Sequence, residues 1–335
     1  MTLKDLAKIL NLSSSTVSRA LNDSYEISQK TKDKVKALAK ELNFTPNPIA
    51  SSLRSQKNKT IAVVIPDITN SFYAKAIEGI EAIAQAKGYH FLIYFSFENY
   101  EKEVSIIHHL SNGRVDGIII SLSAQTNNFK HFEELKNRKI PIVFFDRVCE
   151  EVYAAKITIN NILSAKNGAR HLLNMGCKQI AFLNFSSISQ ASLQRKQGYI
   201  DALNLEKIVV DDAIIISCTN NKEDNLKLIR NLITTNKNID AIFASSENLT
   251  ILTYQVCQDL GIKIPSQIKV LGFSNMSSAS FFNPSLSCIA QPAYDMGKQA
   301  AEVLFKSIEK PKIDYNDVVK ISDAELIVRA SSSIS

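Results

Sequence analysis

The 335-residue chain lacks long apolar runs, an export signal and closely spaced cysteines. No stretch approaches the roughly 20 apolar residues that are needed to span a bilayer. The chain begins Met1-Thr2-Leu3-Lys4-Asp5, without the basic start and apolar segment of a secretory signal. We therefore expect a cytoplasmic protein that has no membrane partner.

The five cysteines lie far apart in the sequence, and no two of them form a Cys-x-x-Cys pair: Cys149, Cys177, Cys218, Cys257 and Cys288. A disulfide framework or a zinc cluster would require closer spacing. His108 and His109 are adjacent, and adjacent residues do not share a helix face. We expect buried free thiols, no metal site and no cofactor.

Motifs that cradle phosphates or activate a nucleophile are also missing. The chain has only ten glycines and contains no Gly-x-Gly-x-x-Gly, no Gly-x-x-x-x-Gly-Lys-Ser/Thr and no Gly-x-Ser-x-Gly. We therefore predict no catalytic residues, and an enzyme is the weaker alternative. A free-standing solute-binding protein is a second alternative, but it would need an export signal and would have no use for residues 1–54.

The positive charge of the chain is concentrated at its N-terminal end. Residues 1–59 contain eleven Lys or Arg and five Asp or Glu, which accounts for the whole net charge of +6 and leaves residues 60–335 neutral. A separate basic end on a neutral body is typical of a nucleic-acid-binding module. A solvated basic tail is the alternative, and the helical periodicity of this end argues against it.

The first 46 residues predict three short amphipathic helices. Thr2, Ser13 and Ser28 are candidate N-caps of these helices. Within each helix the apolar residues repeat with helical spacing: Leu3, Leu6, Ala7 and Leu10; Val17, Ala20 and Leu21; Val35, Leu38, Ala39 and Leu42. The short break between the first two helices indicates a helix-turn-helix.

The outer face of the second helix carries small hydroxyl side chains and one arginine: Ser14, Ser15, Thr16, Ser18 and Arg19. Small hydroxyls allow a helix to approach the major groove closely and to bond phosphates, and an arginine can donate two hydrogen bonds to a guanine edge. Runs of serine and threonine also serve as plain caps and loops, so this face alone leaves both interpretations open.

Taken in order, these segments resemble the headpiece of the LacI/GalR family of bacterial repressors. The matching segments are residues 2–7, 12–22, 27–31 and 46–54. The resemblance implies that Ser14, Ser15 and Arg19 read bases. It implies phosphate contacts for six other residues: Ser13, Thr16, Ser18, Asn22, Ser28 and Thr31. Phosphate contacts fix the register on DNA, and base contacts select the sequence.

Residues 47–59 are interpreted as a hinge helix and a linker. Asn47 and Pro48 suit an N-cap and a first helical residue, but so short a helix is not stable alone in water. The family resemblance implies that the hinge folds against its twin and the operator minor groove. The residues it places there are Asn47, Ile49, Ala50, Leu53 and Arg54. Leu53 matches a wedge between base pairs; a plain anchor of the linker is the alternative.

Residues 60–335 predict an α/β body with doubly wound parallel sheets, because short apolar runs alternate with longer amphipathic stretches. The strand-like runs are 61–65, 91–95, 117–120, 142–145, 180–183, 214–216, 241–244 and 270–273. The family body has two such lobes joined by three crossovers, like periplasmic sugar-binding proteins. We place the first crossover at residues 141–147 and the closing segment at 325–329. The predicted fold is therefore an all-α headpiece followed by a two-lobed effector-binding and dimerisation domain.

Ligands bind beyond the carboxyl ends of strands in open α/β sheets. The resemblance places six residues in this pocket: Phe72 and Tyr73 as an aromatic wall, Asp146 and Arg195 as polar clamps, and Ser246 and Ser274 as further contacts. This set suits a hydroxyl-rich ring such as a sugar, although Phe72 and Tyr73 could be plain core. Many sugar-sensing relatives have two Asp where this chain has Ser274-Asn275, so a charged acceptor for sugar hydroxyls is missing at that position.

The sequence therefore predicts a transcriptional regulator of the LacI/GalR type, a repressor by resemblance, that binds a palindromic operator as a homodimer. A small-molecule effector, a sugar or sugar derivative, would control it allosterically. A two-fold protein suits a two-fold DNA site. The chain ends soon after its last predicted strand without a leucine-heptad tail, which favours a dimer over a tetramer. Such a regulator is expected in the cytoplasm, associated with the nucleoid.

Overall fold

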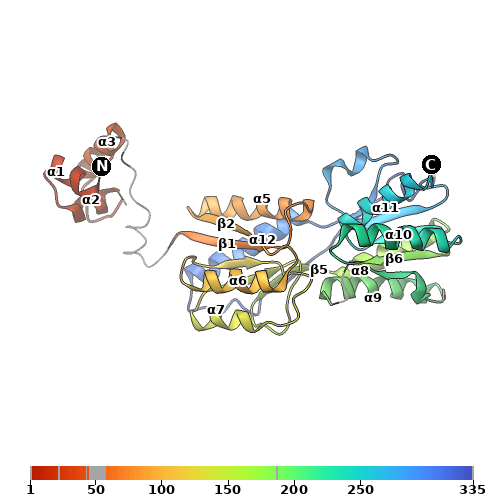
Figure 1. The fold of residues 1–335 in the computed structure, drawn as a ribbon. Helices are drawn as coiled ribbons and strands as arrows, with labels where there is room; N and C mark the ends of the chain where they lie inside the picture. Colours follow the sequence, from red (N-terminus) through yellow and green to blue (C-terminus); the bar gives the residue numbers. More distant parts are fainter. Residues whose placement is uncertain (1, 22, 43, 45–57, 186–187, 334–335) are drawn as a thin grey trace. The chain divides into compact units, whose positions relative to one another are not determined.

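The computed structural model describes residues 2–21, 23–42, 44, 58–185 and 188–333. The chain divides between Asn58 and Lys59 into two compact units, an N-terminal headpiece and a much larger body (Figure 1). Among the helices in these ranges, none is both long enough and apolar enough to cross a membrane.

The headpiece contains the three predicted helices, α1 (Leu3–Ile9), α2 (Ser14–Leu21) and α3 (Gln29–Glu41). The Thr2 side chain caps α1 in a reciprocal arrangement with Asp5, and the Ser28 side chain caps α3. Six buried side chains from the three helices form its core: Leu6, Ala7, Val17, Ala20, Val35 and Ala39. The predicted periodicity of this unit is confirmed.

The first lobe of the body is built on a parallel six-stranded sheet of order β11-β5-β4-β3-β1-β2. Its strands are β1 (Thr60–Ile65), β2 (His90–Phe95), β3 (Ile118–Ile120), β4 (Ile142–Phe145), β5 (Ala155–Ile159) and β11 (Val319–Ser322). Its helical segments are α5 (Ser71–Ala86), α6 (Tyr100–Ser111), η1 (Lys130–Phe132), α7 (Glu133–Asn137) and α12 (Ala293–Glu309). Alternate side chains of β1 face opposite layers, so Ile61 and Val63 pack with α5 and α12, while Ala62 and Val64 pack with α6 and α7.

The second lobe repeats this plan with a sheet of order β12-β10-β9-β8-β6-β7. Its strands are β6 (Ile180–Asn184), β7 (Ile215–Ser217), β8 (Ala241–Ala244), β9 (Lys269–Phe273), β10 (Ser287–Ala290) and β12 (Glu325–Ile327). Strand β12 alone runs antiparallel to its neighbour. Its helical segments are α8 (Asn161–Asn174), α9 (Gln190–Leu205), η2 (Asp212–Ile214), α10 (Lys222–Thr235), α11 (Glu247–Asp259) and η3 (Ser277–Phe281). Helices α8 and α9 cover one face of the sheet, and α10 and α11 cover the other.

The two lobes are joined by three crossovers, but the first one is not where the sequence placed it. Residues 142–145 form β4 inside the first sheet, and the chain then adds β5 to the same sheet. It crosses at Asn160, between β5 and α8, and again at residues 291–292 and 323–324. The prediction was wrong because the run 155–159 was not recognised as a strand, although four of its five residues are buried.

Helices α5 and α12 of the first lobe approach each other closely through two glycines. A Cβ atom on Gly79 would lie 2.0 Å from the carbonyl oxygen of Tyr294, and one on Gly297 would lie 2.0 Å from the carbonyl oxygen of Ala76. Only glycine at both positions permits this packing. Helices α5 and α12, which both begin at the side of this lobe that faces the second lobe, are therefore packed closely against each other.

Candidate functional site

The exposed face of α2 carries the hydroxyl groups that the sequence selected for DNA contact. Val17 and Ala20 point into the core, while Ser15 and Arg19 are exposed and Ser14, Thr16 and Ser18 are half-buried. The helix therefore presents a face of short polar side chains to its surroundings. Such a face can lie close to a DNA groove without steric clash.

The predicted phosphate-binding hydroxyls occur as hydrogen-bonded groups at two helix N-termini. The Ser13 hydroxyl lies 2.7 Å from the Ser15 hydroxyl and 2.8 Å from that of Thr16, and it accepts from the Thr16 amide at 3.1 Å. At α3, the Ser28 and Thr31 hydroxyls lie 2.9 Å apart. Helix N-termini attract anions, so each group is suited to a phosphate.

In the free protein the Arg19 guanidinium is paired with a carboxylate rather than solvated alone. Its Nη1 lies 2.6 Å from Glu26 Oε2, and the two side chains are 59% and 45% exposed. An ion pair this exposed contributes about 0–1 kcal/mol. A guanine edge or a phosphate can therefore displace Glu26 at little cost.

Several predicted DNA-contacting residues lie outside the described residues. They are Asn22 in the headpiece and the hinge positions Asn47, Ile49, Ala50, Leu53 and Arg54. Their roles stay predictions from the family resemblance.

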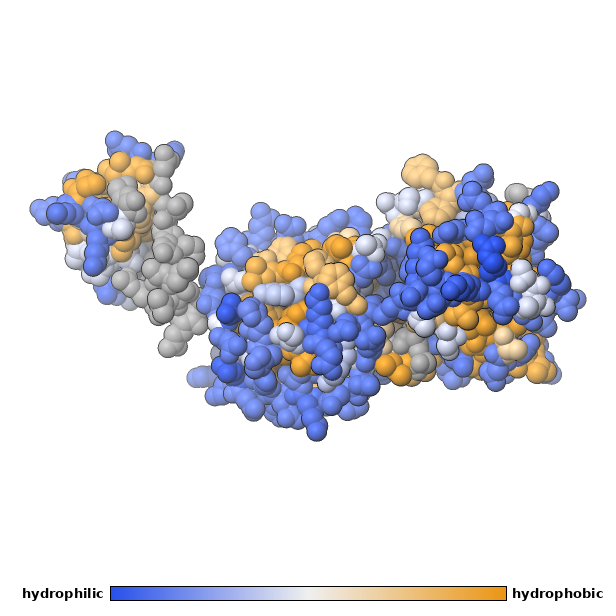
Figure 2. Space-filling model, in the orientation of Figure 1, coloured by the Kyte–Doolittle hydropathy of each residue, from blue (hydrophilic) through white to orange (hydrophobic). Residues whose placement is uncertain are grey.

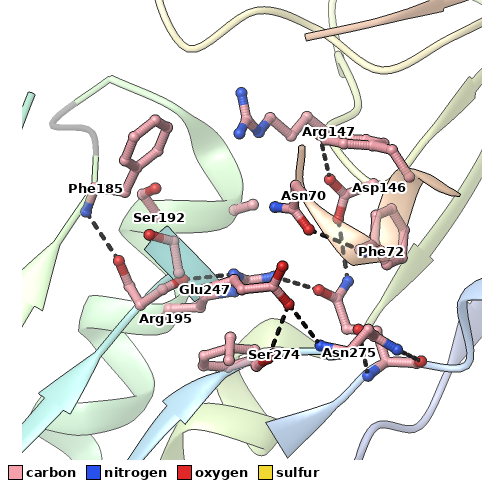
Figure 3. Close-up of a pocket in the computed structure, with 16 residues that line it drawn as sticks. Asn70, Phe72, Asp146, Arg147, Phe185, Ser192, Arg195, Glu247, Ser274 and Asn275 are labelled. Atoms are coloured by element: carbon pink, nitrogen blue, oxygen red, sulfur yellow. Dashed lines mark hydrogen bonds between the residues drawn. The ribbon is translucent and has the colours of Figure 1, made fainter. Parts of the chain in front are cut away.

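All six predicted effector residues line one cavity between the two lobes of the body (Figure 3). The free volume inside it is about 40 Å³, well below the usual range for small-molecule sites, so side chains fill most of the space between the lobes in this arrangement. The predicted lining residues are Phe72, Tyr73, Asp146, Arg195, Ser246 and Ser274. They come from segments far apart in the sequence, and the carboxyl ends of both sheets bring them together.

Asp146 follows β4 directly and is held by donors from two directions. Its Oδ2 accepts from the Tyr73 hydroxyl at 3.0 Å, and its Oδ1 accepts from the Gln291 amide at 3.1 Å. The residue has a positive φ of 60°, a conformation that Asp tolerates better than most residues. Burial raises the pKa of Tyr73 well above its usual value, so its phenol stays protonated and can donate.

Arg195 is a buried cation on α9 with neutral hydrogen-bond partners. It donates to the Asn161 side chain at 2.8 Å, to the Ser245 carbonyl at 2.7 Å and weakly to Gln291 at 3.4 Å. Its guanidinium lies over the Phe273 ring, 3.8 Å from the centroid. Burial lowers its pKa to about 10. A ligand hydroxyl or anionic oxygen in the cavity would compensate this charge.

Arg147 is a second cation at the cavity, and its charge is already paired with the carboxylate of Glu98. Its two Nη atoms bond the two oxygens of Glu98 at 2.6 and 2.9 Å. Burial alone would lower the pKa of Arg147, but Glu98, with Tyr73 and Asp146, raises it above the usual value. On the cavity side the guanidinium faces the ring of Phe185, 5.4 Å from the centroid.

The cavity has a second acid, Glu247, that the sequence reasoning missed. It is the first residue of α11 and is only 5% exposed. Its Oε2 accepts from the Ser274 hydroxyl at 2.8 Å and from the Asn275 amide at 3.0 Å, as Figure 3 shows. The carboxylate that Ser274-Asn275 lacks is therefore supplied from the neighbouring helix.

The aromatic wall and the core are one structure rather than alternatives. Phe72 and Tyr73 are nearly fully buried and belong to the main hydrophobic cluster, yet both line the cavity. Their rings meet edge to face at 5.2 Å, and Phe72 stacks on Phe145 at 6.3 Å. This packing fixes the position of the Tyr73 hydroxyl beside Asp146.

Comparison with known protein families agrees with this arrangement. A family model described as bacterial regulatory proteins of the lacI family matches residues 2–47. A second, described as periplasmic binding proteins and sugar binding domain of the LacI family, matches residues 58–329. The chain belongs to the lacI family.

Individual relatives of this lacI-family chain match over nearly its whole length. Catabolite control protein A of Priestia megaterium is 29% identical over 319 residues, 95% of this chain and 96% of the relative. The HTH-type transcriptional repressor PurR of Vibrio atlanticus is 30% identical over 308 residues, 92% of each. A solved Lac repressor dimer bound to operator and the anti-inducer ONPF shares the fold, with a TM-score of 0.84, 20% identity and coverage of 100% and 99%.

The family assignment confirms the predicted class of function. These relatives are transcriptional regulators rather than enzymes, and this chain is a DNA-binding transcriptional regulator. The predicted helix-turn-helix headpiece and two-lobed α/β body are confirmed as well.

Ten cavity residues of this lacI-family regulator were not predicted: Asn70, Arg147, Phe185, Ala191, Ser192, Ser245, Glu247, Phe273, Asn275 and Gln291. Most of them follow the carboxyl end of a strand by one to five positions. The rule that ligands bind beyond the carboxyl ends of strands indicates the loops that carry most of them, but it does not select the individual residues, and β10 before Gln291 was not predicted as a strand. Among the described residues, no three His, Cys, Asp or Glu side chains are grouped to hold a metal ion.

Proposed function

We propose that this chain represses transcription by binding a palindromic operator as a homodimer, under the control of a small hydroxyl-rich effector, a sugar or sugar derivative. The observation that carries the proposal is the pairing of two features in one chain. A basic headpiece presents a face of hydroxyls and Arg19, and a neutral body encloses a cavity with buried polar groups. The proposed action involves no catalysis.

The proposed division assigns residues 1–46 to the headpiece, 47–59 to the hinge and linker, and 60–335 to the effector-binding and dimerisation domain. The separation of contacts between Asn58 and Lys59 supports it. In this division Ser14, Ser15 and Arg19 read bases, and the hydroxyls at the starts of α2 and α3 hold phosphates. Leu53 enters the minor groove as a wedge.

The effector is proposed to bind in the cavity between the lobes. Asp146 and Arg195 offer an acceptor and a donor there, and Phe72 offers an apolar face. This combination suits a polyhydroxylated ring, in which each hydroxyl both donates and accepts. Because the cavity is shared by both lobes, bound effector favours one lobe arrangement over another, which is the requirement for allosteric control.

Association into a homodimer is supported by the surface of the first lobe. Strand β2 lies at the edge of its sheet, and its Leu92 side chain is 44% exposed between the half-buried Phe91 and Ile93. Figure 2 shows apolar side chains at this surface. An exposed apolar edge strand favours burial against a second copy.

The proposal is tested by a gel-shift titration of the full chain on palindromic duplexes, selected from a random pool, at several salt concentrations. We expect a sequence-specific complex whose affinity falls steeply with salt. Leu53→Ala should weaken operator binding and leave effector binding intact, with Ile251→Ala, an exposed position on α11, as a surface control. A chain that selects no duplex at low salt would refute the proposed function.

The effector is sought by thermal shift with sugars, sugar phosphates and nucleobases. A ligand at one hundred times its Kd should stabilise the body by about 2.7 kcal/mol. Arg195→Met should abolish the shift if the cavity is the binding site. A shift that survives this change would place the ligand elsewhere.

A further inference from the structure

We infer that Glu247 is an internal latch that holds the two lobes of the body closed without an effector. Glu247 begins α11 of the second lobe, and Ser71 begins α5 of the first. The Ser71 amide donates to Glu247 Oε1 at 2.9 Å, and the Ser71 hydroxyl donates to Oε2. These bonds cross the cleft beside Asn275, whose side chain is hydrogen-bonded to the backbone of the crossover residue Gln291.

The Glu247 carboxylate receives four donors, two from each lobe. The second lobe contributes the Ser274 hydroxyl at 2.8 Å and the Asn275 amide at 3.0 Å. Among the described residues no Lys, Arg or His nitrogen lies within 4.0 Å of Glu247. A buried carboxylate without a cation depends on its hydrogen-bond donors. Opening the cleft would remove both donors of Ser71 at once.

Two helix N-termini, one from each lobe, meet at this carboxylate. Helix α5 has sixteen residues and α11 has thirteen, and Ser71 and Glu247 are their first residues. The positive ends of both helix dipoles therefore face the same negative charge. This attraction favours the closed arrangement, because the charge loses one of the two helix ends when the lobes separate.

The latch gives this regulator a closed state that does not require a ligand. Glu247 favours the closed over the open arrangement of the lobes before an effector binds. An effector that enters the cavity then shifts this equilibrium according to how it alters the bonds between Glu247 and Ser71. The inference goes beyond the proposed function. The test of this inference needs neither DNA nor effector, so the inference can fail while the proposed function holds, and the proposed function can fail while the inference holds.

Ser71→Pro is the variant that removes the latch with the least damage. Proline is well accommodated as the first residue of a helix, and Asn70 already has the extended conformation that precedes proline, with a ψ of 118°. The substitution deletes both the amide and the hydroxyl donor. Ser71→Ala deletes the hydroxyl alone, and Ser274→Ala deletes a donor of the second lobe while both cross-cleft bonds remain.

The distance between the two lobes is measured in the full chain by double electron–electron resonance between two spin labels. Spin labels are placed at Ala74→Cys on α5 and Gln255→Cys on α11, both exposed positions. An excess of unlabelled chain suppresses distances between protomers. The five native cysteines are buried, and labelling of the parent chain checks that they do not react.

Without effector, the parent should show a short, narrow distance distribution. Ser71→Pro should move it to longer distances, since the loss of two bonds to a charged acceptor lowers the ratio of closed to open molecules by at least about tenfold. Ser71→Ala should fall between the two, and Ser274→Ala should match the parent. If Ser71→Pro does not fold, Glu247→Gln provides the same comparison. A distribution for Ser71→Pro or Glu247→Gln that coincides with the parent, or an equal shift in Ser274→Ala, would overturn the inference.

Discussion

Replacing Tyr73 by phenylalanine measures how much the hydrogen bond from Tyr73 to Asp146 contributes to the free energy of unfolding. The change deletes one hydroxyl from a side chain that is 2% exposed and leaves the ring packing against Phe72 and Phe145 intact. The Asp146 carboxylate loses its 3.0 Å donor and keeps only Gln291 as a side-chain donor among the described residues. A hydrogen bond to a charged group contributes about 1.5–3 kcal/mol, so we expect the substitution to lower the free energy of unfolding by about 2 kcal/mol.

Tyr199→Phe is the matched control, because Tyr199 is equally buried but donates to the neutral carbonyl of Ile180 at 2.7 Å. A neutral hydrogen bond contributes about 1 kcal/mol. For a body of this size, we expect these losses in free energy of unfolding to lower the Tm by about 4 °C in Tyr73→Phe and by about 2 °C in Tyr199→Phe. Differential scanning calorimetry of the full chain measures both. A loss for Tyr73→Phe no larger than that for Tyr199→Phe would refute the charge-assisted bond to Asp146.

Three further outcomes follow from the described contacts. Gly297→Ala should lower the urea midpoint by an amount equivalent to about 1–3 kcal/mol, because the added methyl meets the Ala76 carbonyl; an unchanged midpoint would mean that α5 and α12 separate freely. Glu26→Gln should strengthen operator binding about threefold in a salt titration by freeing Arg19 and removing a charge near phosphate; weaker binding would show that Glu26 positions Arg19. Burial raises the pKa of Cys218 to about 12, so the native chain at pH 8 should not react with a disulfide reagent; rapid reaction before unfolding would contradict the burial of the thiols.

Much of the headpiece was predictable because its determinants are local. Apolar residues with helical spacing and capping side chains such as Thr2 and Ser28 specify short helices from neighbouring residues alone. The confinement of positive charge to residues 1–59 was likewise visible in the sequence. The strands buried on both faces were predicted for the same reason, since a continuous apolar run such as 61–65 is a local signal.

The missed strands show where local signals end. Strand β11 has alternating exposed and half-buried residues and lies at the sheet edge, so it carries no continuous apolar run. Strand β10 is short and contains Ser287, whose hydroxyl is bonded to the Arg329 carbonyl at 2.8 Å. Because β10 was missed, the cavity residue Gln291 was missed with it, and the crossover at Asn160 was missed because β5 was not recognised as a strand.

The sequence by itself determined the kind of modules and their order, because periodicity, capping and charge act between neighbouring residues. The family resemblance added six of the side chains that face the cavity, and the other ten came only from the structure. Only the tertiary structure decided where the chain passes between lobes and which groups meet there. Ser71 and Glu247 are 176 positions apart, and their bond exists only because two sheets place the starts of two helices at one point. No local pattern encodes such a contact, since its free energy depends on the packing of both lobes.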